Sequence, residues 1–148
     1  MRGGALARMF KHILVPIDLS HKNARTLATA LALATQSNAR VTLLHVVQRV
    51  ANIPFSEMRP FYRRLVATSR RRLADAARPF AAKGLRVRGE VLVGEPAAEV
   101  VRRAMTARAD LVVMGSHKVD PARRDSRGWG TTSYKVGIFC QCPIMLVK

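Results

Sequence analysis

The chain has few cysteines and no long apolar run, and each shortage excludes a class of protein. Its two cysteines, Cys140 and Cys142, have no second cysteine pair or histidine cluster with which to complete a four-ligand metal site. We therefore expect both to be reduced, packed thiols. No apolar stretch approaches the roughly 18 residues of a membrane span. Residues 1–8 lack the apolar centre of a signal peptide. A cytoplasmic protein that makes no use of a membrane is the expectation.

Acidic and aromatic residues are also scarce. There are 9 Asp and Glu against 26 Lys and Arg, which gives a formal net charge of +17. Such an excess attracts polyanions whatever the fold, so nucleic acid is one partner hypothesis. Aromatic residues are only 5% of the chain, however, and the arginines are spread over predicted helix faces rather than interleaved with aromatics. Because base stacking needs aromatic side chains, we favour a basic, solvated surface.

Apolar patterning predicts one domain in which strands and helices alternate. The chain has 148 residues, 49% of them hydrophobic, which suits a single domain with a substantial core. Short apolar runs predict strands at 11–18, 41–47, 87–93, 111–114 and 144–147. Apolar residues at helical spacing predict helices over 24–37, 60–82, 95–105 and 131–139. Residues 41–47 are continuously apolar, as in a strand buried on both faces, whereas 87–93 alternate, as in a less buried or edge strand.

The helical stripes and their boundaries follow from the same pattern. Ser20 or Asn23 can cap the first helix, and Gly84 ends the second. The predicted inner faces are Ala24, Leu27, Ala28, Leu31 and Thr35 in the first helix, Phe61, Leu65, Leu73, Ala76, Ala77 and Phe80 in the second, and Ala97, Val100, Val101, Ala104 and Met105 in the third.

Alternating strands and helices specify an α/β fold: a three-layer α/β/α domain with a five-stranded, mainly parallel sheet and right-handed crossovers. Ligands of such sheets bind at the carboxyl ends of the strands, where the winding direction reverses. Asp18 and Gly115 both follow predicted strands.

The most informative segment is the glycine-rich one that follows the fourth predicted strand. Leu111–Met114 gives way to Gly115-Ser116-His117-Lys118, and later to Gly128-Trp129-Gly130 and three hydroxyl residues, Thr131, Thr132 and Ser133. Glycines expose backbone N–H groups, and a helix start adds the positive end of its dipole. The pattern therefore predicts an anion-binding loop.

Five motifs carry a resemblance to a known family. They are ILVPIDLS at 13–20, LLHVV at 43–47, GEP at 94–96, ADLVVMGSH at 109–117 and CPIMLV at 142–147. In this order and spacing they resemble the universal stress protein family over residues 11–148, with residues 1–10 as an N-terminal extension. The resemblance implies the adenine nucleotide alpha hydrolase-like sheet order 3-2-1-4-5 and a homodimer formed through the last strand. It also implies either ATP-binding or nucleotide-free behaviour, since the family contains both kinds.

The family's ATP-binding pattern is Gly, two residues, Gly, nine residues, Gly, then Ser or Thr, and this chain departs from it. Gly115 matches the first glycine, but Lys118 occupies the second position, and eleven residues rather than nine precede Gly130-Thr131. If that position needs a positive φ, lysine strains the loop. If it does not, Lys118 can add a charge-assisted phosphate contact, and we favour this interpretation.

The resemblance also assigns site residues. The end of the first strand, Pro16, Ile17 and Asp18, and the Val46 backbone would hold the base or ribose. Met114 and Gly115 would shape that side of the pocket. Lys118, Gly130, Thr131, Thr132 and Ser133 would bind phosphates. The alternatives remain open, because Asp18 can simply cap or close a turn, Val46 can be ordinary core, and the three hydroxyl residues can cap an unoccupied helix.

The predicted function is therefore that of a universal stress protein: a dimer that binds ATP, or ADP or AMP, together with Mg²⁺ and signals through occupancy. His117 has no partner acid or nucleophile in sequence, so we assign no catalytic residue and expect slow ATP hydrolysis at most. The alternatives are a nucleotide-free protein-interaction module of the same fold and a basic nucleic-acid-associated protein.

Overall fold

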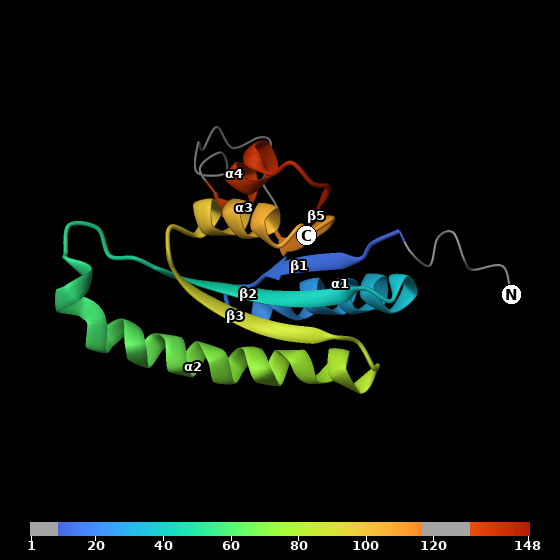
Figure 1. The fold of residues 1–148 in the computed structure, drawn as a ribbon, viewed down its shortest axis with the longest axis horizontal. Helices are drawn as coiled ribbons and strands as arrows, with labels where there is room; N and C mark the ends of the chain where they lie inside the picture. The colour runs from blue at the N-terminus through green and yellow to red at the C-terminus, as the bar shows by residue number, and fades with distance from the viewer. Residues whose placement is uncertain (1–8, 117–130) are drawn as a thin grey trace, which may run out of the picture.

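The computed structural model describes residues 9–116 and 131–148, in which strands and helices alternate as the sequence predicts (Figure 1). The strands are β1 (His12–Pro16), β2 (Arg40–Gln48), β3 (Val87–Gly94), β4 (Leu111–Gly115) and β5 (Ile144–Val147). The α-helices are α1 (Ala24–Ser37), α2 (Phe55–Ala82), α3 (Pro96–Thr106) and α4 (Thr132–Phe139), and a 3-10 turn (His21–Asn23) precedes α1.

The five strands form one sheet in the order β3-β2-β1-β4-β5, and every neighbouring pair is parallel. Both the predicted fold class and the predicted strand order are confirmed. β2 pairs with β1 on one side and β3 on the other, and its residues 41–44 are buried. β3 lies at the edge of the sheet, in agreement with its alternating sequence.

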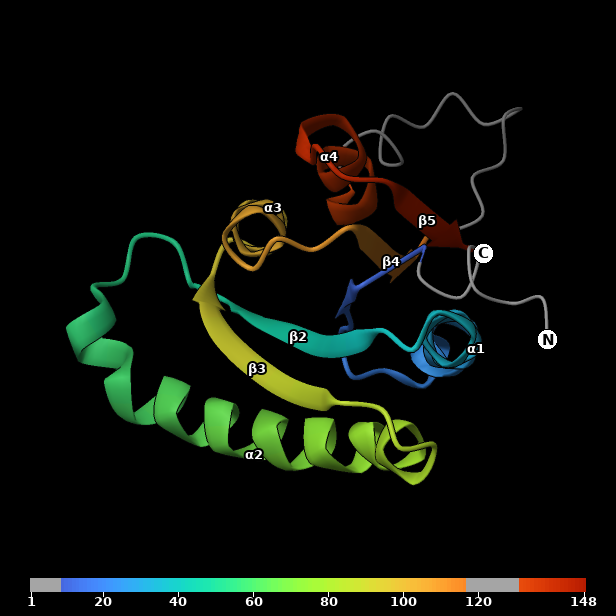
Figure 2. The ribbon, with the colours of Figure 1, turned by 45° about the vertical axis from the view of Figure 1, so that its right-hand side comes forward.

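α1 and α2 cover one face of the sheet, and α3 and α4 cover the other (Figure 2). Alternate strand residues point to opposite faces, so Ile13 and Val15 pack with α1 and α2, whereas Leu14 and Leu44 pack with α3 and α4. The two resulting cores lie back to back across the sheet. Gly89 allows one close contact in the first core, since a Cβ built there would lie 2.9 Å from the Leu73 Cβ on α2.

The buried face of α1 differs from the predicted stripe. Its fully buried positions are Thr26, Ala30, Ala34 and Ser37, while Leu27 and Leu31 flank them, half-buried. Small side chains let the helix axis approach the strands closely, so the larger leucines contact the core from the sides. The apolar pattern of the sequence therefore placed the buried stripe of α1 one residue away from the stripe that the structure buries.

α2 begins at Phe55, before the predicted start at Pro60, and Pro60 lies inside the helix. Aromatic packing supports this early turn. The Phe55 ring stacks on Tyr62 with centroids 5.2 Å apart, and the Tyr62 hydroxyl accepts a hydrogen bond of 2.8 Å from the Val50 N–H. Tyr62 is buried, whereas Phe61 and Leu65, predicted for the inner face, are 40% and 37% exposed.

The winding direction reverses between β1 and β4. The chain passes from β1 outward to β2 and β3, then crosses back through α3 to β4 on the other side of β1. Connections that leave two adjacent strands in opposite directions open a crevice at the strands' carboxyl ends.

Within the described residues, no helix combines the length and apolarity that crossing a bilayer requires.

Candidate ligand-binding crevice

A cavity of about 700 Å³ lies at this reversal, at the carboxyl ends of β1, β2 and β4. The starts of α1, α3 and α4 and the end of β5 complete its wall. Every predicted site residue in the described part of the chain lines this one cavity: Pro16, Ile17, Asp18, Val46, Met114, Gly115, Thr131, Thr132 and Ser133. The other two, Lys118 and Gly130, lie outside the described residues.

Asp18 closes the turn between β1 and the 3-10 turn. Its Oδ1 accepts hydrogen bonds from the Ser20 N–H, at 2.9 Å, and from the Asn23 side-chain amide. Burial opposes ionisation, but these hydrogen bonds outweigh it, so the pKa of Asp18 is lowered. The turn-closing role is therefore what these contacts show. Oδ2 receives neither of these two hydrogen bonds.

The backbone of Val46 extends beyond the end of β1. Arg40 N–H donates to Lys11 and the Leu44 carbonyl accepts from Ile17 N–H, so even-numbered residues of β2 direct their backbone groups toward β1. Val46 has the same orientation, but the paired register stops at Pro16 and Leu44. In the described chain no strand continues opposite Val46. Its N–H donor and C=O acceptor therefore face the crevice side by side.

The His45 ring binds the Ile17 carbonyl, the last carbonyl that could have paired with the Val46 N–H. Its Nδ1 lies 2.9 Å from the Ile17 carbonyl oxygen, and a carbonyl can only accept, so Nδ1 carries the proton. The Ile17 carbonyl is thus turned to the His45 ring. This contact explains why the β1–β2 ladder ends where the crevice begins.

Hydroxyl groups and a lysine gather at the α4 end of the cavity. Thr131 caps α4, with its Oγ1 accepting from the Tyr134 N–H at 3.4 Å. Its hydroxyl lies 3.3 Å from that of Ser133, which lies 3.5 Å from that of Ser116. Lys148 Nζ donates to Ser116 at 3.2 Å. This end joins a helix N-terminus with hydroxyls and an ammonium group, a combination suited to an anion.

The opposite part of the wall is apolar. Leu44, Val100 and Met114 are buried residues of the α3–α4 core whose side chains reach the cavity. On the α1 side, Gly115 lies close to the helix, because a Cβ built there would come 3.2 Å from the Thr26 Oγ1. A flat apolar group therefore has a surface to pack on, with polar groups at its edges.

Sequence reasoning missed several residues of the wall, among them Lys22, Arg25, Thr26, His45, Ser116 and Lys148. Ser116 and His45 lie next to predicted residues, and their positions just past a glycine or beside Val46 could have indicated them. Lys148 carried no such signal, because only the parallel pairing of β5 with β4 brings it to Ser116. Of the described residues that line the cavity, Asp18 is the one carboxylate, opposed by Lys22, Arg25 and Lys148.

Comparison with known sequences places the whole chain in a family. The model of the universal stress protein family matches residues 9–148. A universal stress protein encoded in the QAH/OAS sulfhydrylase 3' region of Thermus aquaticus is 33% identical over 145 residues, which cover 95% of this chain and 100% of that protein. Universal stress protein YxiE of Bacillus subtilis (strain 168) is 26% identical over 150 residues, with 95% and 100% covered.

Solved structures share the fold at lower identity. Universal stress protein UspA from Lactobacillus plantarum superposes with a TM-score of 0.76 at 22% identity, covering 93% of this chain and 97% of that one. A universal stress protein solved in complex with cAMP gives 0.69 at 21% identity, with 94% and 97% covered. One from Archaeoglobus fulgidus in complex with dAMP gives 0.67 at 18% identity, with 95% and 99% covered. With a family model that spans residues 9–148 and a relative 33% identical, the chain belongs to the universal stress protein family.

Proposed function

We propose that this protein binds an adenine nucleotide, ATP with Mg²⁺, in the crevice between β1 and β4 and acts through its occupancy. The observation that carries the proposal is the polarity of the cavity. One end offers apolar surface and the free Val46 backbone, and the other offers hydroxyls, a lysine and the start of α4. The structures of family members bound to cAMP and dAMP support an adenine nucleotide as the ligand class.

The base end matches the hydrogen-bonding edge of adenine. Adenine presents a donor, its amino group, next to an acceptor, a ring nitrogen, and Val46 presents a backbone acceptor and donor side by side. The base would pack against Val100 and Met114. The Oδ2 oxygen of Asp18 would accept a hydrogen bond from the ribose or the base, while Oδ1 keeps the turn closed.

The phosphate end matches a polyanion. Lys148, Lys22 and Arg25 supply positive charge, and the first N–H groups of α4 point out of the helix start. Mg²⁺ fits this end as a companion of the phosphates, because it commonly keeps phosphate and water ligands. Searched over the described residues, the chain shows no group of three His, Cys, Asp or Glu that could hold a metal by itself. The hydroxyl oxygens of Ser116 and Ser133 would be the protein's contribution.

Slow turnover at most is part of the proposal. Asp18, the carboxylate on the described wall, is held in the turn after β1 by Ser20 and Asn23. A general base has to lie beside an attacking water at the terminal phosphate. Occupancy rather than hydrolysis is therefore the proposed signal.

A homodimer through β5 completes the proposal. β5 is the last strand of the sheet order, and its Met145 and Leu146 side chains are 37% and 39% exposed. Ile138 and Phe139 at the end of α4 are 56% and 68% exposed. An edge strand with neighbouring apolar side chains is a natural pairing surface for a second copy.

The test is a calorimetric titration with adenosine, AMP and ATP, each with and without Mg²⁺. We expect affinity to rise with the number of phosphates. The Lys148→Gln variant should bind ATP about 5- to 10-fold more weakly, because it loses one charge-assisted contact, and should bind adenosine as the wild type does. The matched control is Lys83→Gln, which removes an exposed lysine after α2, away from the crevice.

Two results would reject the proposal. One is the absence of heat with all three ligands in protein that also releases no nucleotide on denaturation. The other is an equal loss of ATP affinity in the Lys148 and Lys83 variants, which would assign the effect to net charge.

A further inference from the structure

A second cavity, of about 580 Å³, lies at the opposite edge of the sheet, where the strands begin. It forms where the segments that lead into β2, β3 and β4 meet the start of β1. Five arginines line it, and no carboxylate does among the described residues: Arg40, Arg86, Arg88, Arg103 and Arg108. We call it the amino-edge arginine pocket.

Three of these arginines come from equivalent places in the fold. Arg40 is the first residue of β2, Arg86 directly precedes β3, and Arg108 lies between α3 and β4. All three are exposed, and in the described chain none of them forms an ion pair. Parallel strands start at one edge, so arginines that are far apart in sequence converge there.

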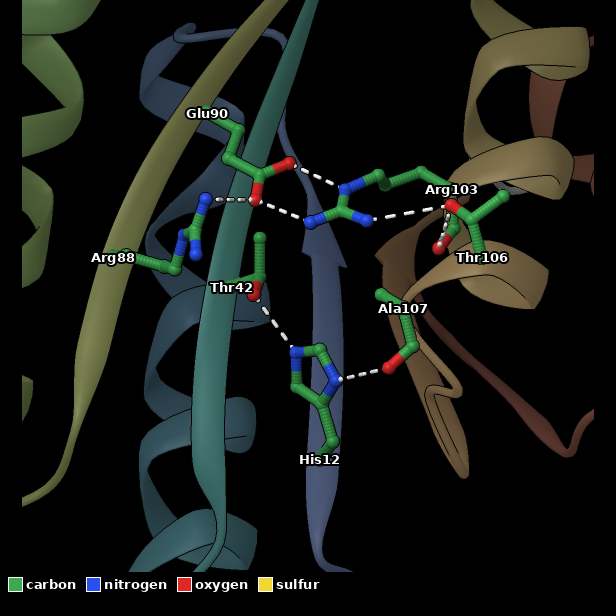
Figure 3. A network of polar contacts seen from close by, with 7 residues as sticks. All are labelled: His12, Thr42, Arg88, Glu90, Arg103, Thr106 and Ala107. Atoms are coloured by element: carbon green, nitrogen blue, oxygen red, sulfur yellow. Dashed lines mark hydrogen bonds and ion pairs between the residues drawn. The ribbon is translucent and has the colours of Figure 1, made fainter.

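The other two arginines are held in place by one carboxylate. Glu90 accepts two hydrogen bonds from Arg103, from Nε to Oε2 at 2.5 Å and from Nη2 to Oε1 at 2.6 Å (Figure 3). It also forms an ion pair with Arg88 at 2.9 Å. Arg103 Nη1 also donates to Thr106 at 3.3 Å. One negative charge shared by two guanidinium groups leaves this wall positive and restricts the Arg103 side chain.

His12 forms the floor of the pocket as a neutral ring. Its Nδ1 donates to the Ala107 carbonyl at 3.1 Å, and its Nε2 accepts from the Thr42 hydroxyl at 2.8 Å (Figure 3). Burial lowers the pKa of His12, and the nearby Arg40 and Arg103 lower it further, against the opposing effects of the Ala107 bond and Asp110. The nearby carboxylate, Asp110, accepts from the Lys11 and His12 backbone N–H groups at 2.7 and 3.1 Å.

We propose that the amino-edge arginine pocket binds a small anion with several phosphate groups, an oligophosphate, independently of the nucleotide crevice. Guanidinium groups match phosphate oxygens in pairs, and those of Arg40, Arg86 and Arg108 form no ion pair in the described chain, while Arg88 and Arg103, bound to Glu90, add positive charge to the same concavity. Among the described residues the lining holds no Phe, Tyr or Trp, and the His12 ring is buried between Ala107 and Thr42, so the lining offers a base no exposed aromatic ring to stack on. Recognition through the phosphates alone fits a compact ligand better than a nucleic acid strand.

The direct test is titration with inorganic tripolyphosphate, followed by the NMR signals of the histidine rings. His12 lines the amino-edge arginine pocket and His45 lines the crevice, so each ring reports one site. We expect the His12 signals to move and the pKa of His12 to rise, because a bound anion offsets the neighbouring arginines. Movement of the His45 signals with unchanged His12 signals would overturn the proposal and assign the anion to the crevice. An ATP titration separates the two sources of a triphosphate, since the crevice hypothesis predicts a His45 response.

The variant that tests the pocket is the triple substitution Arg40→Gln, Arg86→Gln and Arg108→Gln. Its matched control, Arg63→Gln, Arg64→Gln and Arg72→Gln, removes three exposed arginines from α2. We expect the first to weaken tripolyphosphate binding at least about tenfold and the control less than about twofold. Equal losses would overturn the proposal and assign binding to net charge. If the triple variant loses its circular dichroism spectrum, the single variant Arg86→Gln, expected to weaken binding about threefold, decides the question in the same way.

Discussion

Asp18 illustrates how one side chain can serve the fold and a ligand at the same time. Its Oδ1 is committed to Ser20 and Asn23, and Leu19, between Asp18 and Ser20, adopts a left-handed φ of 64°. A non-glycine residue in this region costs free energy, so the turn depends on the bonds that Asp18 accepts. The second oxygen is the one that we propose for the ligand.

The Asp18→Asn variant separates these two roles. The amide oxygen can still accept from Ser20 and Asn23, but the ligand-facing oxygen becomes an NH₂ group. We expect ATP affinity to fall about tenfold, because an acceptor is replaced by a donor. Calorimetry with the folded variant measures this, and unchanged affinity would place the ribose and base away from Asp18.

The same variant predicts a pH dependence of stability. The pKa of Asp18 is lowered in the folded chain, so its ionisation stabilises the fold above its unfolded pKa, about 3.9, and this contribution is lost as pH falls through the lower folded pKa. Wild type and Asp18→Asn should differ by at most about 1 kcal/mol at neutral pH, since the carboxylate is largely exposed, and should converge in acid. Urea unfolding at several pH values tests this. A difference that grows below pH 4 would contradict it.

At the scale of secondary structure, the exposed face formed by β5 and α4 is the proposed dimer surface. Leu146→Lys puts a charge on it, and we expect the dimer to dissociate because the lysine would have to be buried against the second copy. Leu65→Lys on α2, at 37% exposure against 39% for Leu146, is the matched control. Light scattering after size exclusion gives the mass. A dimer that survives Leu146→Lys and dissociates with Leu65→Lys would move the interface to α2.

The order and type of the elements could be predicted from the sequence, but the faces they bury only in part. Continuous apolar runs marked β1, β2 and β4, since parallel strands inside a sheet are buried on both faces, whereas the edge strand β3 was marked by alternation and β5 by a short apolar run. The α1 face was wrong because Thr26 packs closely against the Gly115 region, which is a tertiary contact. α3 was partly right: Ala97, Val100 and Ala104 are buried, but Met105 is 66% exposed.

The residues of the candidate site likewise separate into those that the sequence could predict and those that only the fold brings together. Asp18 and Thr131 could be predicted because a polar residue directly follows an apolar run or directly precedes a helix. His45, Thr26 and Lys148 reach the crevice only through the pairing and packing of separate elements. The roles of Lys118 and Gly130 remain predictions, since both lie outside the described residues. The amino-edge arginine pocket had no sequence signal, because its arginines come from segments that meet only in the folded sheet.

At the scale of the whole molecule, the net charge of +17 has two components. Arginines around the amino-edge arginine pocket converge on one concavity, whereas those of α2 cover an exposed face. A convergent group can select a compact anion, but a dispersed group attracts any polyanion over the range of a Debye length. The nucleic-acid hypothesis rests on the dispersed component.

Salt dependence tests that hypothesis. If DNA association is driven only by the charge of the surface, its affinity should fall by roughly 10³-fold between 50 and 200 mM salt, given six or more phosphate contacts. Fluorescence anisotropy with unrelated duplexes measures this, and we expect no preference between sequences. An affinity that held at 200 mM and depended on sequence would instead establish a nucleic-acid-binding function.

The parallel sheet also has a practical consequence for the design of expression vectors. The pairing of β5 with β4 brings Lys148 into the wall of the crevice between β1 and β4. A histidine tag fused directly after Lys148 would therefore place added imidazole groups next to this crevice. Protein freed of its tag by proteolysis is the right material for every titration, and a comparison with the tagged protein would reveal whether the tag disturbs the crevice.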